Sequence, residues 1–287
     1  MTEKLYIIGN GFDLHHGLRT SYMNFRDNYV KKRSPIFWNY LLDIYGDTPQ
    51  QDDLWWRDFE NMLGRVDYAS LANSHNGEAI GFMKVRNFMQ GTLPPLFGKW
   101  IKEVDTQIDL NTLTLVPEID TDSWFFTFNY TMLLERFYNV DDSHICHIHD
   151  SIKHPDDIIV GHDSDGGQLV KYVQEYNKDY QKTDSSYANS INQYVINGAK
   201  KVKDRIISYE IEGKFNQYSD IKHFVVMGFS LNDIDIPYIK MIIEVNKNIL
   251  GADWTLYWYS DGEDEYMINK LLELGIDRGK INTPIKW

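Results

Sequence analysis

Glycine and polar residues stand at four points of the chain where an apolar run ends. Gly9-Asn10-Gly11 follows the first run, and Asp13 lies just beyond it. Asn129 and His149 follow two later runs, and Gly228-Phe229-Ser230 follows another. Glycine lets a ligand approach the backbone, while amide, carboxyl, imidazole and hydroxyl groups can bind it or transfer protons. These segments are therefore the candidate functional site.

The first segment is typical of a nucleotide-binding turn. Glycines after a strand let the backbone approach a diphosphate, and the N-terminus of the following helix attracts the anion. The dinucleotide fingerprint needs a third glycine at position 14, where this chain has Leu14. We also find no acidic residue ending a second strand about 20 residues later. The segment argues against an ordinary dehydrogenase, and a tight turn that binds nothing is the alternative.

Asn129 and a pair of histidines are the other candidates for chemistry. Asn129 could hydrogen-bond a ligand or water, or it could be a helix N-cap or turn residue with a local role. His147 and His149 are two residues apart, which places them on the same face of a strand, so we expect neighbouring imidazoles. With His162 they could bind a metal ion, but histidine pairs also serve in cores and in catalysis. We therefore predict no metal.

Hydrophobic periodicity predicts strands that alternate with helices. The predicted strands cover residues 4–8, 123–128, 144–149, 158–160, 223–227 and 254–259. The predicted helices cover residues 21–45, 53–66, 80–104, 188–210 and 263–274, with others beginning near Leu133 and Asp235 and a break or restart at Pro94-Pro95. This alternation favours an α/β, Rossmann-like fold with a mostly parallel sheet. Because ligands bind beyond the carboxyl ends of such strands, the four segments are expected at one edge.

Composition narrows the class of protein further. The net charge of −13 comes from 29 basic and 42 acidic side chains and disfavours binding to a nucleic-acid backbone. Cys146 is the only cysteine, which excludes an intramolecular disulfide and a cysteine-rich zinc site. No signal-peptide core and no apolar run of about 20 residues is present, so we expect no membrane association and a cytoplasmic location. We expect one domain over residues 1–287, with helical insertions at about 21–110 and 168–212.

Several segments resemble a known family, in the same order and over nearly the whole chain. They are IIGNGFDLHHGLRTSYMNF, WWRDFENML, TFNYTMLLERFY, HIHD and GFSLNDIDIPY. Together they resemble the AbiH family of bacterial phage abortive-infection proteins. That family is in turn similar to sirtuin-like domains, which have a Rossmann-type core and bind NAD. The resemblance therefore implies a sirtuin-like core and NAD as ligand or substrate.

The resemblance also implies roles for individual residues. Gly9 and Gly11 would line the diphosphate, and Gly228 with Ser230 would form a ribose loop. The predicted cofactor-binding residues are Gly9, Asn10, Gly11, Asp13, Gly228 and Ser230, of which Asp13 belongs to the opening AbiH segment without an implied role.

Asn129 and His149 are the predicted catalytic residues. Asn129 would lie near the nicotinamide ribose and orient a water, and His149 would be the base acting on a ribose hydroxyl. Asp150 stands where the sirtuin pattern has glycine after the histidine, and Asp150 or Glu135 could stabilise charge. The four cysteines of the sirtuin deacylase zinc module are missing, which disfavours protein deacylation.

These observations lead to a main hypothesis and two alternatives. The main hypothesis is a phage-defence protein that hydrolyses the nicotinamide–ribose bond of NAD through an oxocarbenium-like transition state. The first alternative is a non-catalytic module that senses a nucleotide or a phage component. The second is a nuclease-like toxin that uses Asp13, His149 and His162 with a metal. The partners compatible with these hypotheses are a nucleotide-type small molecule, a phage-derived trigger and a second copy of the chain.

Overall fold

The computed structural model describes residues 3–67, 83–109, 113, 115–116, 119–163, 200–258 and 262–287. The contacts divide the chain into two compact units. Unit 1 comprises residues 1–20, 101–158 and 202–287, and unit 2 comprises residues 21–100 and 159–201. The single domain with two insertions stays a prediction, and residues 168–199 of the second insertion lie outside the described residues.

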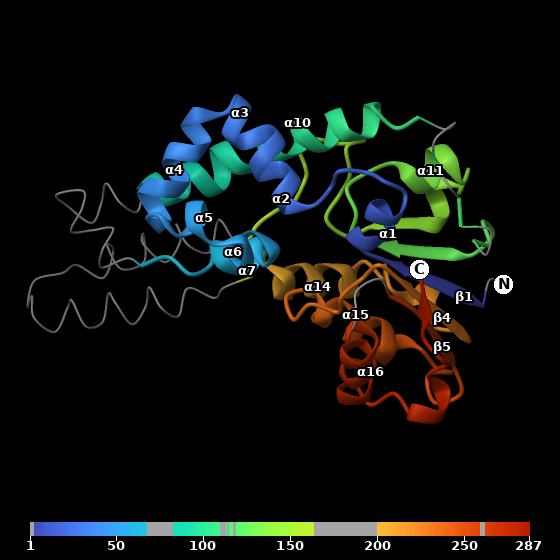
Figure 1. Cartoon of the computed structure of the whole chain (residues 1–287). Coiled ribbons are helices and arrows are strands. Elements are labelled where there is room, and N and C mark those ends of the chain that lie inside the picture. The colour runs from blue at the N-terminus through green and yellow to red at the C-terminus, as the bar shows by residue number, and fades with distance from the viewer. Residues whose placement is uncertain are drawn as a thin grey trace, which may run out of the picture. The chain divides into compact units, whose positions relative to one another are not determined.

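Unit 1 is built on a six-stranded sheet whose strands are all parallel (Figure 1). The strands are β1 (Lys4–Ile8), β2 (Trp124–Thr127), β3 (Ile145–His147), β4 (His223–Met227), β5 (Asp253–Trp258) and β6 (Ile285–Lys286). Their order across the sheet is β3-β2-β1-β4-β5-β6. This is the strand order of the doubly wound dinucleotide-binding folds. The α/β, Rossmann-like class is therefore confirmed.

Helices cover both faces of this sheet, as parallel strands require. Those of unit 1 are α1 (Asn10–His15), α11 (Leu133–Phe137), α14 (Val202–Ile211), α15 (Ile236–Val245) and α16 (Glu263–Glu273). Short 3-10 turns, η3 (Asp142–His144), η4 (Asn216–Tyr218) and η5 (Arg278–Lys280), lie between them. Figure 1 shows α1 and α11 on one side of the sheet and α15 and α16 on the other.

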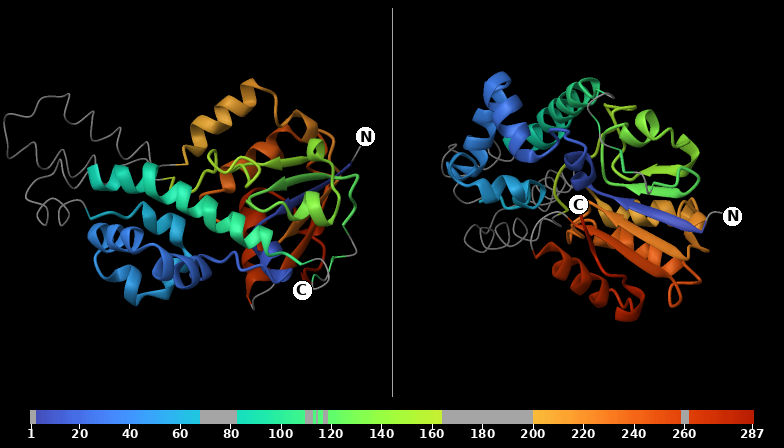
Figure 2. Two further views of the ribbon diagram at one scale, coloured as in Figure 1. Left: turned by 90° about the horizontal axis from the view of Figure 1, so that it is seen from above. Right: turned by 45° about the vertical axis from the view of Figure 1, so that its right-hand side comes forward.

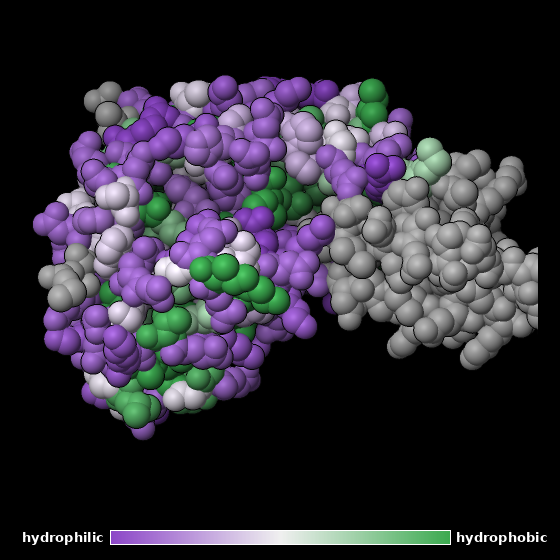
Figure 3. All heavy atoms as spheres, turned by 180° about the vertical axis from the view of Figure 1, so that it is seen from behind, coloured by the Kyte–Doolittle hydropathy of each residue, from purple (hydrophilic) through white to green (hydrophobic). Residues whose placement is uncertain are grey.

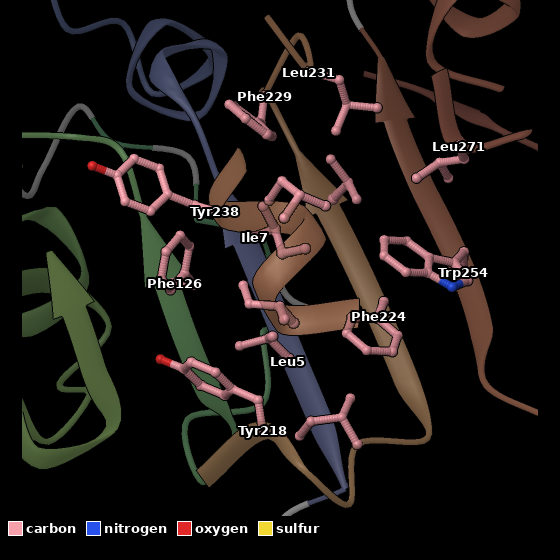
Figure 4. Close-up of a cluster of buried hydrophobic side chains, with 14 of the residues drawn as sticks. Leu5, Ile7, Phe126, Tyr218, Phe224, Phe229, Leu231, Tyr238, Trp254 and Leu271 are labelled. Carbon is pink, nitrogen blue, oxygen red and sulfur yellow. The ribbon is translucent and has the colours of Figure 1, made fainter. Parts of the chain in front are cut away.

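Alternation along β1 explains why the sheet has two cores. Leu5 and Ile7 are fully buried in a cluster with residues of α15 and α16, including Tyr238 and Leu271. Figure 4 shows this cluster. Ile8 belongs to a second cluster, formed with residues of α1 and α11. Successive side chains of a strand point to opposite faces, so an apolar run such as that of β1 is what a strand buried on both faces needs.

Two predictions about strands differ from the structure. Residues 158–160 form no strand, although Ile158 and Val160 are buried, and they belong to none of the strands in the sheet that the structure describes. The short strand β6 was not predicted, since Ile285 and Lys286 are exposed and carry no apolar alternation. β6 exists because the edge of β5 offers free hydrogen-bonding groups.

Unit 2 is helical in the part that the structure describes (Figure 2). Its elements are α2 (Tyr22–Asn24), the π-helix η1 (Phe25–Val30), α3 (Lys31–Arg33), α4 (Pro35–Tyr45), α5 (Thr48–Gln51), α6 (Asp53–Arg57), α7 (Phe59–Leu63), the π-helix η2 (Asn87–Thr92) and α10 (Leu93–Thr106), whose last residues belong to unit 1. The helix predicted over residues 53–66 is interrupted at Asp58 and ends at Leu63. Pro94 and Pro95 lie where the π-helix η2 passes into α10, and the helical conformation continues through them from residue 83 to Thr106, so the predicted break or restart is wrong.

The surface is mainly hydrophilic, with apolar side chains in small groups (Figure 3). In unit 1 the most exposed large apolar side chains are Leu250, which is 87% exposed, and Ile211, which is 82% exposed. Isolated apolar side chains are normal on protein surfaces. Among the described residues, none of the helices has the length and apolar character that crossing a bilayer requires.

Candidate functional site

The four segments singled out from the sequence follow four neighbouring strands. The hydrogen bonds between neighbouring strands continue one residue past the strand ends. Gly9 N donates to Met227 O at 3.0 Å, and Phe128 N donates to Ile8 O at 2.9 Å. Ile148 N likewise donates to a carbonyl of β2 at 3.1 Å. The segments therefore lie side by side at the carboxyl edge of the sheet. The strand order reverses between β1 and β4, which is where ligands of such folds bind.

Gly9, Gly11 and Gly228 bring two backbone segments into direct contact. A Cβ atom on Gly9 would lie 2.5 Å from the Cα of Phe229, and one on Gly11 would lie 2.6 Å from the Cα of Gly228. Gly228 has a φ of +60°, and a Cβ atom there would lie 2.1 Å from the nitrogen of Phe12. Gly11 N also donates to Gly228 O at 2.8 Å. Packing between the two turns thus explains why glycine is needed at these three positions. Their contact with a diphosphate stays a prediction.

Asp13 is a buried carboxyl group between two donors. Its Oδ1 accepts from Asn129 Nδ2 at 2.9 Å, and its Oδ2 accepts from the Thr131 hydroxyl at 2.9 Å. Burial raises the pKa of Asp13 from 3.8 to about 7, although both hydrogen bonds oppose the rise. Asp105 raises this pKa further, and His147 lowers it. The Asp13 carboxyl therefore changes its protonation state near neutral pH.

Asn129 is held by its backbone as well as by its side chain. It is 6% exposed, and its N–H donates to Thr127 Oγ1 at 3.0 Å. Its Nδ2 bonds to Asp13, whereas its buried Oδ1 accepts no hydrogen bond from any residue that the structure describes. The N-cap of α11 is Met132, so Asn129 is no helix cap. Its Oδ1 is an acceptor that suits a water or a ligand hydroxyl.

The loop that carries Asn129 is fixed at its next residues too. Tyr130 O accepts from Ile152 N at 2.9 Å, and Met132 N donates to Asp105 Oδ1 at 2.9 Å. Asp105 is 1% exposed and forms an ion pair with Arg136. These contacts pre-organise the loop, as an enzyme or binding site requires.

His147 and His149 enter different surroundings, because β3 ends at His147 and a turn follows. The expectation of neighbouring imidazoles on one strand face is therefore wrong. His147 Nδ1 lies 2.9 Å from Asn129 O, and its Nε2 lies 2.8 Å from Glu135 Oε1. Both of its nitrogens thus face protein groups. Burial lowers the pKa of His147, but Glu135, the Asn129 carbonyl and Asp150 together raise it above its usual 6.5.

His149 lies among aromatic rings and next to a carboxylate. It is 2% exposed, and its ring centroid lies 5.7 Å from that of Phe128, 6.2 Å from that of Tyr130 and 6.0 Å from that of Tyr238. Its Nε2 lies 3.4 Å from Asp235 Oδ1. A carboxylate beside an imidazole orients the ring and stabilises the imidazolium, which suits a base.

Two further residues that were predicted to bind the ligand lie at the surface, at the carboxyl edge of the sheet. Asn10 and Ser230 are exposed, and Asn10 Nδ2 donates to Thr20 O at 3.2 Å. Asp150 has a φ of +62°, the left-handed region that favours glycine and tolerates aspartate. Asp150 Oδ1 accepts from Ser151 N at 2.8 Å, which satisfies it locally.

His162 belongs to unit 2, whereas the other site residues belong to unit 1. Burial lowers the pKa of His162 to about 4, which keeps the ring neutral at pH 7. Its backbone carbonyl accepts from Lys200 N at 2.6 Å. Within the described ranges, there is no group of three or more His, Cys, Asp or Glu side chains that could hold a metal ion.

Sequence reasoning missed Thr131, Asp105 and Asp235 as parts of the site. Thr131 and Asp235 lie inside the family-like segments TFNYTMLLERFY and GFSLNDIDIPY, which was the available signal. Asp105 lies outside these segments, and only its contacts point to it.

Fold and site together define a Rossmann-like α/β protein with a buried polar network at the carboxyl edge of its sheet. A family model described as bacteriophage abortive infection AbiH matches residues 5–90 and 82–258. The chain therefore belongs to the AbiH family, which associates it with phage abortive infection. A comparison with curated proteins found no match to the chain.

Proposed function

We propose that this AbiH protein binds NAD or a related nucleotide at the carboxyl edge of the sheet and hydrolyses its nicotinamide–ribose bond during phage defence. The observation that carries the proposal is the Asn129 side chain. It donates to Asp13, while its Oδ1, buried at the same edge, accepts no hydrogen bond from the described residues. A ribose hydroxyl or an attacking water would donate to this oxygen.

The proposed reaction needs few groups from the protein. The oxygen of water bonds to C1′ of the ribose while the C1′–N bond breaks. The electron pair of the C1′–N bond stays with the pyridinium nitrogen and neutralises it. Nicotinamide leaves as a neutral molecule, so no acid has to protonate it. The ribose becomes positively charged in the transition state, as in glycoside hydrolysis. The Asp13 carboxylate would stabilise that charge, and His149 would take the proton of the water or of a ribose hydroxyl.

The likeness to sirtuin-like pockets belongs to the same proposal. It is supported by the strand order and by the positions of Asn129 after β2 and His149 after β3. The exposed side chains of Asn10 and Ser230, with the glycine turns, would contact the rest of the dinucleotide. We also propose a cytoplasmic location, with NAD as substrate and a phage-derived trigger.

Product analysis on the purified protein tests the proposal. NAD is added, and nicotinamide and ADP-ribose are separated and quantified. We expect the wild-type protein to release nicotinamide. Asn129→Ala and His149→Ala should each reduce this release by about 100-fold or more, in the range of general acid–base effects. His223→Gln is the matched control, because His223 is exposed at the first residue of β4, the opposite end of that strand. No release by the wild type, or full release by both site variants, would refute the catalytic assignment.

A second candidate function is nucleotide sensing without turnover. Its support is burial, because Asp13 and His149 are each only 2% exposed, which restricts access to a scissile bond. NAD or ADP-ribose would then raise the melting temperature of the protein without forming product. The variant Ser230→Ala, at an exposed side chain, would weaken this stabilisation, whereas a wild-type protein that no dinucleotide stabilises would exclude the sensing function.

A further inference from the structure

His147 is placed so that both of its ring nitrogens face acceptors. Nδ1 lies 2.9 Å from the backbone carbonyl oxygen of Asn129, which can only accept. Nε2 lies 2.8 Å from Glu135 Oε1, a carboxylate oxygen. A neutral imidazole has one N–H and can satisfy only one of these acceptors. Both hydrogen bonds form together when the ring is the imidazolium ion.

The charged groups around His147 favour that ion. Glu135 reaches it from α11, and its side chain is 10% exposed. Asp150, after β3, also raises the pKa of His147, and Asp13 of α1 interacts with it electrostatically. Lys153 interacts with Glu135 and is the opposing cation among these groups. Three carboxyl groups thus act on one half-buried imidazole.

The consequence concerns Asn129. Its backbone carbonyl accepts from His147, its N–H donates to Thr127 and its side chain donates to Asp13. Without the His147 donor, this carbonyl would face a lone pair or an apolar group, and a polar group buried without a hydrogen bond is destabilised. The backbone at Asn129 would then shift, and the position of its side chain would shift too.

We propose that the doubly protonated His147, paired with Glu135, is a positioning residue that holds Asn129 in its place at the site. Its effect on catalysis rests on the proposed function, whereas the clamp itself does not. When His147 loses a proton as pH rises, the remaining N–H stays with the carboxylate, which is the stronger partner. The Nδ1 lone pair then faces the Asn129 carbonyl and repels it. The site is therefore ordered below the titration midpoint of His147 and loosened above it.

Nuclear magnetic resonance of histidine-labelled protein tests the clamp without any activity. We expect both nitrogens of His147 to be protonated at pH 5.5, with a titration midpoint above 6.5, the ordinary value. The signal is assigned by its loss in His147→Asn. Glu135→Gln offers an NH2 donor to Nε2, so the ring should become neutral with its hydrogen on Nδ1. A single protonated nitrogen in the wild type at pH 5.5, or a midpoint below 6.5, would overturn the proposal.

Hydrogen exchange and kinetics then test positioning. His147→Leu should increase exchange in residues 127–132 and reduce kcat for NAD by about tenfold or more, as losses of supporting partners do. His147→Asn keeps a donor near the Nδ1 position and should retain most of the activity. Glu135→Gln keeps the clamp with a neutral ring, so the decline of kcat above the His147 midpoint should disappear. Unchanged exchange in folded His147→Leu would overturn the proposal.

The two proposals fail in different ways. If the wild type releases no nicotinamide but His147 is an imidazolium and His147→Leu loosens residues 127–132, the reaction is wrong and the clamp stands. If nicotinamide is released at equal rates by the wild type and by folded His147→Leu, the clamp has no role in catalysis and this inference is wrong.

Discussion

Replacing Asp13 by asparagine should make the protein more stable at neutral pH. In the folded protein the carboxyl is 2% exposed and its pKa is raised to about 7, whereas in the unfolded chain the value is near 3.8. Between these two pH values the folded state binds a proton that the unfolded state has released, so stability falls as pH rises. At about 1.4 kcal/mol for each pKa unit, the fall amounts to up to about 4 kcal/mol.

Asparagine removes this pH dependence and keeps the geometry. Its Oδ1 can accept from Asn129, and its NH2 group can donate to the Thr131 hydroxyl, which rotates to accept. The free energy of unfolding of Asp13→Asn minus that of the wild type should therefore increase from pH 4 to pH 7 by up to about 4 kcal/mol. Above pH 7 the difference should be constant.

Urea denaturation of both proteins in a series of buffers from pH 4 to pH 8 measures this difference. Asp156→Asn is the control, because Asp156 is exposed and its replacement should give a nearly flat line. A difference that is independent of pH, or that decreases as pH rises, would refute the reasoning about Asp13. In the activity assay Asp13→Asn should also slow nicotinamide release, since it removes the negative charge beside Asn129.

Two further predictions concern the neighbours of this carboxyl. Gly11→Ala should destabilise the protein by about 1–3 kcal/mol, because its Cβ would lie 2.6 Å from the Cα of Gly228. Gly91→Ala is the control, since a Cβ atom there meets no atom within 4 Å. Thermal denaturation compares the two variants, and equal melting temperatures would contradict the packing argument. Thr131→Val should cost about 1 kcal/mol at pH 8 and raise the pKa of Asp13, because the lost hydroxyl bond favours the charged carboxylate. A fall in stability that continues to higher pH than in the wild type checks the second effect.

Much of the sheet could be predicted from the sequence because its signals are local. The apolar runs of β1, β4 and β5 and the turn residues after them lie within a few positions of one another. Proline in the first turn of α15 likewise marks a helix start by backbone geometry alone. The strand β6 and the end of β3 could not be read in this way, because pairing with a neighbour and a turn at Ile148 decide them.

The glycine turn shows where interpretation of a motif from sequence stops. A Gly-x-Gly after a strand indicates that something approaches the backbone closely, and that inference is correct. The sequence does not say what approaches. In the structure the approaching group is the backbone of Gly228, which is more than 200 residues away in the sequence. Steric exclusion acts between groups in space, so the motif alone cannot separate a ligand from another part of the chain.

By itself the sequence determined the α/β class, the family segments and the positions of Asn129 and His149 at strand ends, since each depends on residues near one another in the chain. Only the tertiary structure decided how these residues are paired. Asp13 contacts Asn129 across 116 positions, and His147 contacts the Asn129 carbonyl, whereas His149 lies among aromatic rings. Hydrogen bonds and pKa values depend on distance and burial, which arise when the strands assemble in the order β3-β2-β1-β4.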